Sequence, residues 1–248
     1  MPDPQRARSF GAVAAEYARH RPRYPQEAVD LALHPAWPPG RVLDLGAGTG
    51  VLTAALLARG LDVVAVEPDP GMLAQLHAEL PGADAREGSA EAIPLPAGSV
   101  DAVLVGQALH WFDLTLATPE MARVLRPGGV LAGLWNSADP GAGWPHELGT
   151  VAGSAHPPNP RGAGYDVQMP GEPFFEPAER ADVRWSRPMT VDSYLADVAT
   201  HSWALTAEPA ERDAAFARMR AYLAARPETS SGTFELPMLT LVWRTLRR

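Results

Sequence analysis

The sequence contains no cysteine, and this absence excludes disulfide bonds, thiolate metal ligands and cysteine nucleophiles. It has no apolar run approaching the ~20 residues that cross a bilayer. Its first twenty residues, MPDPQRARSFGAVAAEYARH, lack the sustained apolar segment of a secretory signal. We therefore expect a cytoplasmic protein with no membrane partner.

Basic residues are in the minority, because 21 Lys and Arg stand against 29 Asp and Glu for a net charge of −8. This balance argues against a nucleic-acid partner. Two common site motifs, the G-x-x-x-x-G-K-[ST] phosphate loop and the G-x-S-x-G nucleophile elbow, are missing. Some loops carry residues able to bind a metal, but their spacing is not that of a metal site, and we expect no metal: Asp139, His146, His156 and Asp166.

What the chain does contain is an alternation of apolar strands and helices over its first half. Continuous apolar strands separated by helices of this length are typical of a parallel sheet covered on both faces. The ligands of such sheets lie outside the carboxyl ends of the strands. The predicted strands are 41–45, 61–67, 100–106 and 130–136, and the predicted helices between them are 51–59, 72–80 and 116–125.

The two ends of the chain differ from this regular part. Residues 1–25 form a basic arm dotted with aromatic side chains. Residues 137–232 are predicted to form a cap, first rich in Gly and Pro and then helical, with one core strand near 181–188. Residues 233–248 are predicted to form a final strand. We interpret the whole chain, 1–248, as a single domain in which the cap covers the active edge of the sheet.

A glycine-rich turn follows the first predicted strand in RVLDLGAGTG. Gly46, Gly48 and Gly50 alternate, and Val51 stands where a dinucleotide-binding fingerprint needs a further glycine. This departure disfavours a nicotinamide-dependent dehydrogenase. Glycines here allow a sharp turn and let a ligand lie against bare backbone at the start of a helix. Asp44 is placed to accept a hydrogen bond from an ammonium group.

Acidic and small residues mark the ends of the next strands. Glu67 ends the second strand, where its carboxylate can accept both hydroxyls of a ribose. In EGSAEAIPLP, Ser89 and Ala90 are placed to face an adenine ring, and Glu91 its exocyclic amine. An amino-acid group at the first turn and a ribose at the second strand together describe S-adenosylmethionine.

Four motifs then carry a family resemblance: DLGAGTG, VVAVEPDPGML, GSAEAIPLPAGSVDAVLVGQALHWFD and ARVLRPGGVLAGLWN. They resemble, in order, the motifs of class I S-adenosylmethionine-dependent methyltransferases, and most of all the small-molecule type 11 branch. The match covers about residues 41–136, the cofactor-binding core. The arm and the tail FELPMLTLVWR are similar to that branch as well.

The resemblance implies a Rossmann-like α/β fold with seven strands, the last of them antiparallel to the rest. It also implies that the arm folds over the cofactor, with Tyr17 against the methionine end and Arg23 near the carboxylate. S-adenosylhomocysteine would be the product of methyl transfer. The cofactor-binding residues expected from the motifs and the resemblance together are Tyr17, Arg23, Asp44, Gly46, Ala47, Gly48, Gly50, Glu67, Pro68, Met72, Ser89, Ala90, Glu91 and Gln107.

The acceptor side of the site is less defined. His110 follows the strand at which the reactive methyl should be presented, and it either lines the site or accepts a proton from the attacking atom. Alignment of the reacting atoms alone can supply most of the acceleration. The predicted acceptor-lining residues are His110, Trp111, Trp144, His201 and Trp203.

The predicted function is therefore methyl transfer to a small organic acceptor, at oxygen first and at nitrogen or carbon as alternatives. Two alternative hypotheses also include binding of S-adenosylmethionine. One is a cyclase or rearrangement enzyme that does not transfer the methyl group, and the other is a non-enzymatic cofactor-binding module. The oligomeric state is left open between monomer and homodimer.

Overall fold

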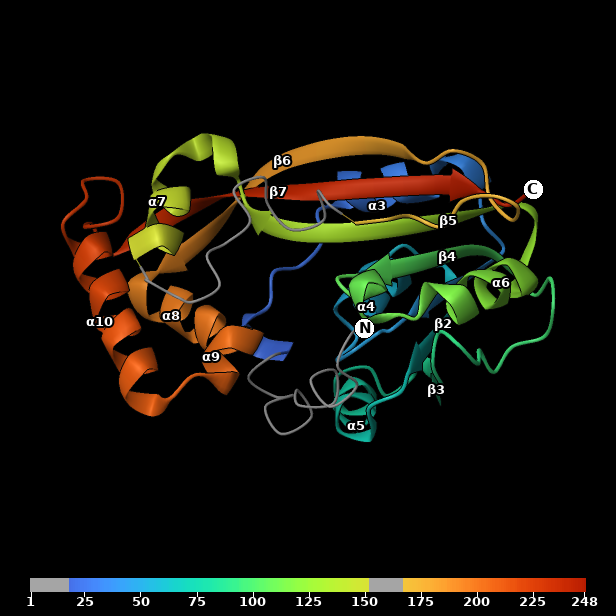
Figure 1. Cartoon of the computed structure of the whole chain (residues 1–248), viewed down its shortest axis with the longest axis horizontal. Coiled ribbons are helices and arrows are strands. Elements are labelled where there is room, and N and C mark those ends of the chain that lie inside the picture. Colours follow the sequence, from blue (N-terminus) through green and yellow to red (C-terminus); the bar gives the residue numbers. More distant parts are fainter. Residues whose placement is uncertain (1–17, 152–166) are drawn as a thin grey trace.

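The computed structural model describes residues 18–151 and 167–248, and within them the strands form one sheet (Figure 1). Its seven strands follow the order β3-β2-β1-β4-β5-β7-β6. The pairs β1–β2, β1–β4, β2–β3 and β4–β5 are parallel, and β7 is antiparallel to both of its neighbours. The predicted fold is thus confirmed. The strands are β1 Arg41–Leu45, β2 Asp62–Glu67, β3 Asp84–Glu87, β4 Val100–Gly106, β5 Leu125–Ala138, β6 Glu179–Thr190 and β7 Thr233–Leu246.

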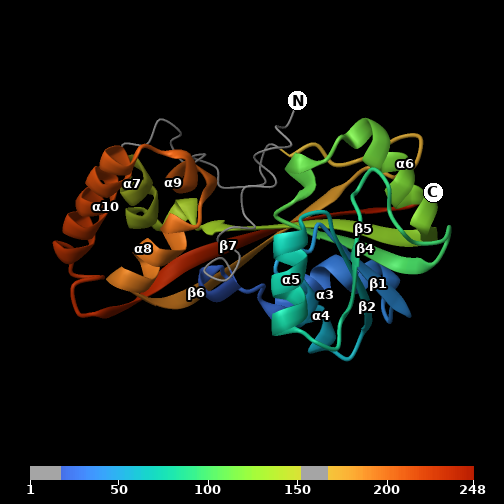
Figure 2. The same cartoon turned by 90° about the horizontal axis from the view of Figure 1, so that it is seen from below.

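Helices cover both faces of the sheet, because alternate residues of each strand point to opposite sides. Val42 and Leu104 pack with the helices on one face, and Leu43 and Val103 pack with α6 on the other. Figure 2 shows α3, α4 and α5 on one side of the strands and α6 on the other. These helices are α3 Gln26–Leu33, α4 Val51–Leu57, α5 Pro70–Glu79 and α6 Leu114–Val124, with short 3-10 turns at His34–Ala36 and Leu109–Trp111.

Two of the helices begin at the carboxyl edge of the sheet with aspartate caps. The Asp69 carboxylate accepts hydrogen bonds from the backbone N–H groups of Gly71 and Met72, and Pro70 fits the first helical position of α5. The Asp113 carboxylate accepts from the N–H of Thr115 at the start of α6. These caps fix where the chain turns back, and therefore place the loops that follow β2 and β4.

The last two strands extend beyond the rest of the sheet. Met238 pairs with Ala138 at the end of β5, and residues 233–237 of β7 then pair with β6 alone. Pro237 is tolerated in this two-stranded ribbon because it lies beyond the end of β5. The ribbon carries a helical lobe, seen beyond the carboxyl end of β5 in Figures 1 and 2. The lobe consists of η4 Pro140–Ala142, α7 Trp144–Val151, α8 Val191–Ala199, α9 Ser202–Thr206 and α10 Pro209–Ala224.

The lobe has an apolar core of its own. Phe234 and Met238 of β7 pack with Leu148 of α7, Leu195 of α8 and Met219 of α10. The predicted loop-rich stretch thus contains a helix, α7, that its Gly and Pro content concealed. In the described part of the chain, no helix has the length and apolar character to cross a membrane.

Residues 18–25 run between the lobe and the sheet, as the blue segment of Figure 1 shows. On the lobe side, Arg21 Nη2 donates to the Thr200 carbonyl at 3.3 Å, and Arg187 donates to the His20 carbonyl. On the sheet side, Tyr24 is buried with the helices that cover one face. This part of the N-terminal arm therefore contacts both halves of the molecule.

Candidate cofactor-binding site

The glycine turn after β1 has the conformation for which its glycines are needed. Gly46, Gly48 and Gly50 have φ angles of 71°, 57° and 87°, which side chains rarely adopt. A Cβ on Gly46 would approach Ala108 to 2.8 Å, and one on Gly50 would approach Leu76 to 2.9 Å, whereas one on Gly48 would meet no atom within 4 Å. Gly48 therefore presents bare backbone to open space.

Glu67 joins the glycine turn to the end of β2. Its side chain is 7% exposed, and its two oxygens accept hydrogen bonds from the N–H of Gly48 at 2.8 Å and of Asp69 at 2.9 Å. Burial raises the pKa of this carboxyl group, and the two backbone donors oppose the shift. Each carboxylate oxygen has a second lone pair. Glu67 can thus hold the loop and still accept hydrogen bonds from a ligand.

Asp44 is the most deeply buried acid of the site, with 1% of its surface exposed. Its Oδ2 accepts a hydrogen bond from the Thr53 hydroxyl at 2.6 Å, whereas its Oδ1 has no partner among the described residues. Burial raises the pKa of Asp44 to about 7, the Thr53 hydroxyl opposes this shift, and the nearby charge of Glu67 adds to it. An orphaned buried carboxyl oxygen is costly unless a ligand pairs with it.

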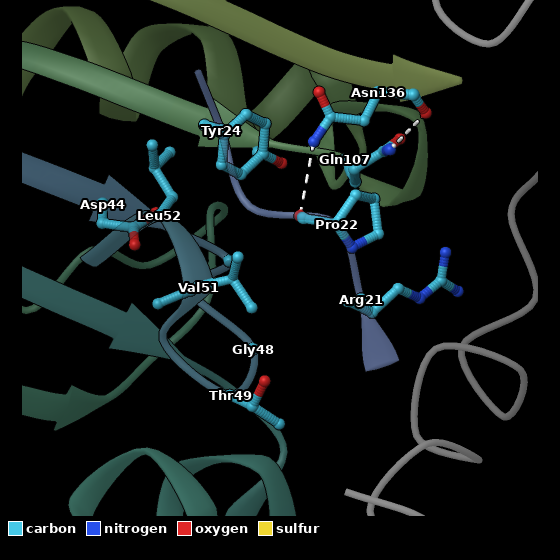
Figure 3. A pocket seen from close by; sticks show the side chains of 13 residues that line it. Arg21, Pro22, Tyr24, Asp44, Gly48, Thr49, Val51, Leu52, Gln107 and Asn136 are labelled. Atoms are coloured by element: carbon cyan, nitrogen blue, oxygen red, sulfur yellow. Dashed lines mark hydrogen bonds between the residues drawn. The ribbon is translucent and has the colours of Figure 1, made fainter. Parts of the chain in front are cut away.

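Asp44 and the glycine turn line one pocket with the N-terminal arm (Figure 3). The turn forms one wall, and the arm residues Arg21 and Pro22 lie opposite. Five of the predicted cofactor-binding residues line it: Asp44, Gly46, Ala47, Gly48 and Gln107. The other lining residues are Arg21, Pro22, Tyr24, Thr49, Val51, Leu52, Gly106 and Asn136.

Asn136 at the carboxyl half of β5 holds the arm in place. Its Nδ2 donates to the carbonyls of Pro22 and Arg23, each at 3.4 Å, while its Oδ1 accepts from the Thr240 hydroxyl at 2.6 Å. Gln107 donates from Nε2 to the Asn136 carbonyl at 2.8 Å and has a φ of 59°, a strained value for a residue other than glycine. This strain lies at the end of β4, beside the pocket.

The arm reaches the pocket through a different arginine from the one predicted. Arg21 lines the pocket, whereas Arg23 is exposed and supplies its carbonyl to Asn136. The role of Arg23 stays a prediction, and Arg21 is the better placed cation. Tyr17, the other arm residue of the prediction, lies outside the described residues.

The remaining predicted cofactor residues lie outside this pocket, around the ends of β2 and β3. Met72 and Ala90 are buried, and Pro68 is exposed. Ser89 forms an isolated bridge with Ala92, and Glu91 accepts a hydrogen bond from the N–H of Asp113 at 3.0 Å. Gly50 begins α4 against Leu76. The assignment of an adenine site to this region stays a prediction.

The five predicted acceptor-lining residues fall into two groups. His110 and Trp111 lie together after β4 with ring centroids 4.8 Å apart, whereas Trp144, His201 and Trp203 belong to the lobe. The pocket of Figure 3 includes none of the five. Trp144 packs edge-on against Phe234 at 5.7 Å, a contact that explains this side chain without a ligand.

Two of these residues are histidines whose environments favour the neutral ring. Burial lowers the pKa of His201 to about 3, and the charge of Arg21 adds to this effect. Desolvation also lowers the pKa of His110, although its side chain is exposed, so the effect there is weak. Both imidazoles are therefore uncharged hydrogen-bond acceptors at neutral pH.

Thr53 and Asn136 are the site residues that sequence reasoning missed. Thr53 lies in the first turn of the helix that follows the glycines, on the side facing Asp44. Asn136 is a polar residue near the carboxyl end of a strand that pairs in parallel with β4. Asp44 and Glu67 were predicted as site residues because they hold the same kind of position. The signal for Asn136 was thus present in the sequence. No group of three or more potential metal-ligating side chains occurs in residues 18–151 and 167–248.

Comparison with known proteins identifies the family. Residues 43–133 match a family described as "Methyltransferase domain". An uncharacterized methyltransferase of Mycobacterium tuberculosis (strain ATCC 25618 / H37Rv) is 46% identical over 238 residues, covering 95% of this chain and 94% of that protein. A malonyl-[acyl-carrier protein] O-methyltransferase of Methylococcus capsulatus is 40% identical over 133 residues, covering 50% of this chain and 48% of that protein.

A solved structure from Anaeromyxobacter dehalogenans, described as a "Putative Type II Methyltransferase", is 27% identical, with a TM-score of 0.65 over 92% of this chain and 97% of that one. The fold is thus that of a class I methyltransferase. The chain therefore belongs to the methyltransferase family, as its motifs indicated.

Proposed function

We propose that the chain binds S-adenosylmethionine across Asp44–Gly50, Glu67 and Ser89 and transfers its methyl group to an oxygen atom of a small organic acceptor. The observation that carries the proposal is the buried Asp44 with a free Oδ1 in the same pocket as the Gly48 backbone. A cationic amine satisfies that oxygen. The space beside Gly48 leaves room for the chain of the amino-acid group.

The residues present fit each end of this cofactor. Asp44 would accept from the ammonium group, and Arg21, which lines the opposite wall, would pair with the carboxylate. Glu67 would accept from the ribose hydroxyls through its remaining lone pairs. When bound, S-adenosylmethionine supplies a methyl group already activated on a sulfonium sulfur.

The protein's own contribution to the reaction is alignment and the exclusion of water. Gln107 and Asn136 are locked to each other at the ends of β4 and β5, and the arm closes the pocket beside them. Fixed geometry of this kind can lower a displacement barrier by about 7–11 kcal/mol. His110 lies in the turn Leu109–Trp111 after β4 and, being neutral, can accept the proton that an attacking hydroxyl loses.

Oxygen is favoured as the methylated atom by one relative. The protein of Methylococcus capsulatus that matches half of this chain is an O-methyltransferase. The lobe lies beyond the carboxyl end of β5 and offers Trp and Met side chains around its apolar core, which suits an apolar or aromatic acceptor. Nitrogen and carbon are the alternative acceptor atoms.

The test is a turnover assay with methyl-labelled S-adenosylmethionine and pools of small acceptors, combined with calorimetric titration of S-adenosylhomocysteine. We expect binding, and label in a product equal in amount to the demethylated cofactor. Product without demethylated cofactor would indicate a rearrangement enzyme. Tight binding with no turnover in any pool would indicate a cofactor-binding module, and no binding would refute the proposal.

A further inference from the structure

Asp44 and Thr53 form a buried pair at the base of the pocket. We infer that Thr53 is a positioning residue, which holds the Asp44 carboxyl so that its free oxygen takes the ammonium of S-adenosylmethionine, and that the pocket releases one proton as the cofactor binds. This inference rests on the proposed function, because it concerns the same pocket. It adds a residue and a proton that the methyl transfer itself does not require.

The geometry fixes the direction of the carboxyl group. Thr53 has no exposed surface, and its hydroxyl donates to Asp44 Oδ2 at 2.6 Å, a short bond of the charge-assisted kind. A carboxyl group with one oxygen tied to α4 cannot turn freely, so Oδ1 is the oxygen left for the pocket. Oδ1 is buried and has no partner in the described part of the chain.

The groups around Asp44 and Thr53 determine whether the Asp44 carboxyl group carries a proton. Glu67 adds negative charge from the end of β2, Arg21 lines the pocket from the arm, and Thr53 is the neutral donor from α4. Burial places the pKa of Asp44 at about 7, so in the empty protein near neutral pH this carboxyl group is partly protonated. An ammonium group at Oδ1 favours the carboxylate, and the proton then leaves to solvent.

Protonation of Asp44 opposes binding of the ligand, so the direction of the pH dependence is fixed. Because the empty protein binds a proton that the complex does not, affinity falls as the pH drops below about 7, by at most about tenfold per pH unit. Above that pH Asp44 is already ionised in the empty protein, so its titration no longer changes the affinity. The amine of the ligand begins to titrate only near pH 8, so the acidic limb belongs to the protein.

The experiment is calorimetric titration of S-adenosylhomocysteine into the protein from about pH 5.5 to 7.5, in phosphate and in ACES, two buffers of different ionisation enthalpy. The difference in heat between the buffers counts the protons released. We expect close to one proton at the acidic end, falling towards zero at the upper end. Asp44→Asn should release about one proton fewer and bind more weakly, which separates Asp44 from the histidines that titrate in this range.

Variants of Thr53 test the positioning role. Thr53→Val keeps the shape and removes the donor that holds down the pKa of Asp44, so the acidic limb should move to higher pH and affinity at pH 7 should fall about three- to tenfold. Thr53→Ser keeps the hydroxyl and should restore both. A simple packing role would leave the pH profile of Thr53→Val unchanged.

The outcomes separate this inference from the proposed function. Binding of S-adenosylhomocysteine to the wild-type protein without proton release would overturn the inference and leave the proposed function intact. A Thr53→Val profile identical to that of the wild type would also overturn it. Failure to bind at every pH would instead refute the proposed function itself.

Discussion

The sheet half of the molecule and the helical lobe differ in how far apart along the chain their polar partners lie. At the sheet, the carboxylates Asp44 and Glu67 bond to residues close in sequence, at Thr53, Gly48 and Asp69. At the lobe, polar contacts join distant segments, as between Arg226 just after α10 and Glu147 of α7 at 2.9 Å. The sheet thus presents a short local motif to a ligand, whereas the lobe presents a surface assembled from several parts of the chain.

This difference suggests a division of labour that follows the proposed function. Local motifs keep their geometry when loops elsewhere change, and so suit a cofactor that every member of a family shares. A surface assembled from separate helices can be altered piece by piece, and so suits an acceptor that differs between proteins. If the two regions are separate in this way, a substitution in the lobe should leave cofactor binding at the sheet unchanged.

The largest effect is expected in the lobe. Trp144→Ala removes a ring that is 8% exposed and packs against Phe234, and should lower the free energy of unfolding by about 3–5 kcal/mol. Chemical denaturation measures this change, and Trp37→Ala, at a ring that is 56% exposed, is the matched control with little effect. Affinity for S-adenosylhomocysteine should stay within about threefold for the folded variant. A larger loss would contradict the separation.

The next effect concerns the ribose site. Glu67→Ala removes charge-assisted hydrogen bonds and should weaken binding of S-adenosylhomocysteine by about 1–3 kcal/mol, as measured by calorimetry. Glu87 pairs in register with Glu67 on β3 but is exposed, so Glu87→Ala is the control that should bind normally. Unchanged affinity in Glu67→Ala would remove the ribose assignment.

A smaller effect is expected from alanine substitutions at two glycines, which separate the cost of backbone strain from the loss of space for the ligand. Gly48→Ala and Gly98→Ala each place a methyl group in open space at a φ near 60°, and both should cost about 1–2 kcal/mol of stability. Only Gly48→Ala puts that methyl group in the pocket. We expect it to weaken binding of S-adenosylhomocysteine by about tenfold, or ~1.4 kcal/mol, with no change in Gly98→Ala. Equal affinities would place the ligand elsewhere.

The smallest effect is on the stability of the empty protein. The folded pKa of Asp44, about 7, lies above its unfolded value near 4, so the carboxyl group opposes folding increasingly as pH rises between these values. Asp44→Asn should therefore raise the melting temperature at pH 8 by about 3 °C and leave it unchanged near pH 4. The gain is modest because the buried amide also lacks a partner. A lower melting temperature of Asp44→Asn than of the wild type at pH 8 would contradict the destabilising effect of the buried Asp44 carboxylate.

The sequence was sufficient to predict the regular part of the fold. β1, β2 and β4 are continuous apolar runs bounded by turn residues, and their ends were predicted to within a residue or two. β5 begins earlier than expected, at Leu125, because Val100 of β4 pairs with it ahead of a bulge. β6, Glu179–Thr190, extends beyond the predicted 181–188, because the exposed side chains of the ribbon do not look like a buried strand, whereas β7, Thr233–Leu246, lies within the predicted 233–248. The helix α7 could not be expected from a Gly- and Pro-rich stretch.

The candidate site likewise contains residues that could be located from the sequence and residues that could not. Asp44, the glycines and Glu67 could be located because each follows a strand, and the carboxyl ends of parallel strands share one edge. Arg21 could not be told from Arg23, because neither lies on a periodic element. The link from Asn136 to Thr240 joins residues more than a hundred positions apart, and only the antiparallel register of β5 and β7 brings them together.

The ribbon of β6 and β7 has a consequence for how such a protein can diverge. The chain leaves the sheet at the end of β5 and rejoins it at Phe175, which bridges Arg247, and then at β6, and residues 191–232 leave after β6 and return at β7. Both excursions therefore start and finish on strands whose register is already set by the sheet. Insertions or deletions within them can reshape the acceptor side while the scaffold beneath stays in frame, whereas cutting the lobe away would also unpair the strands that complete the fold.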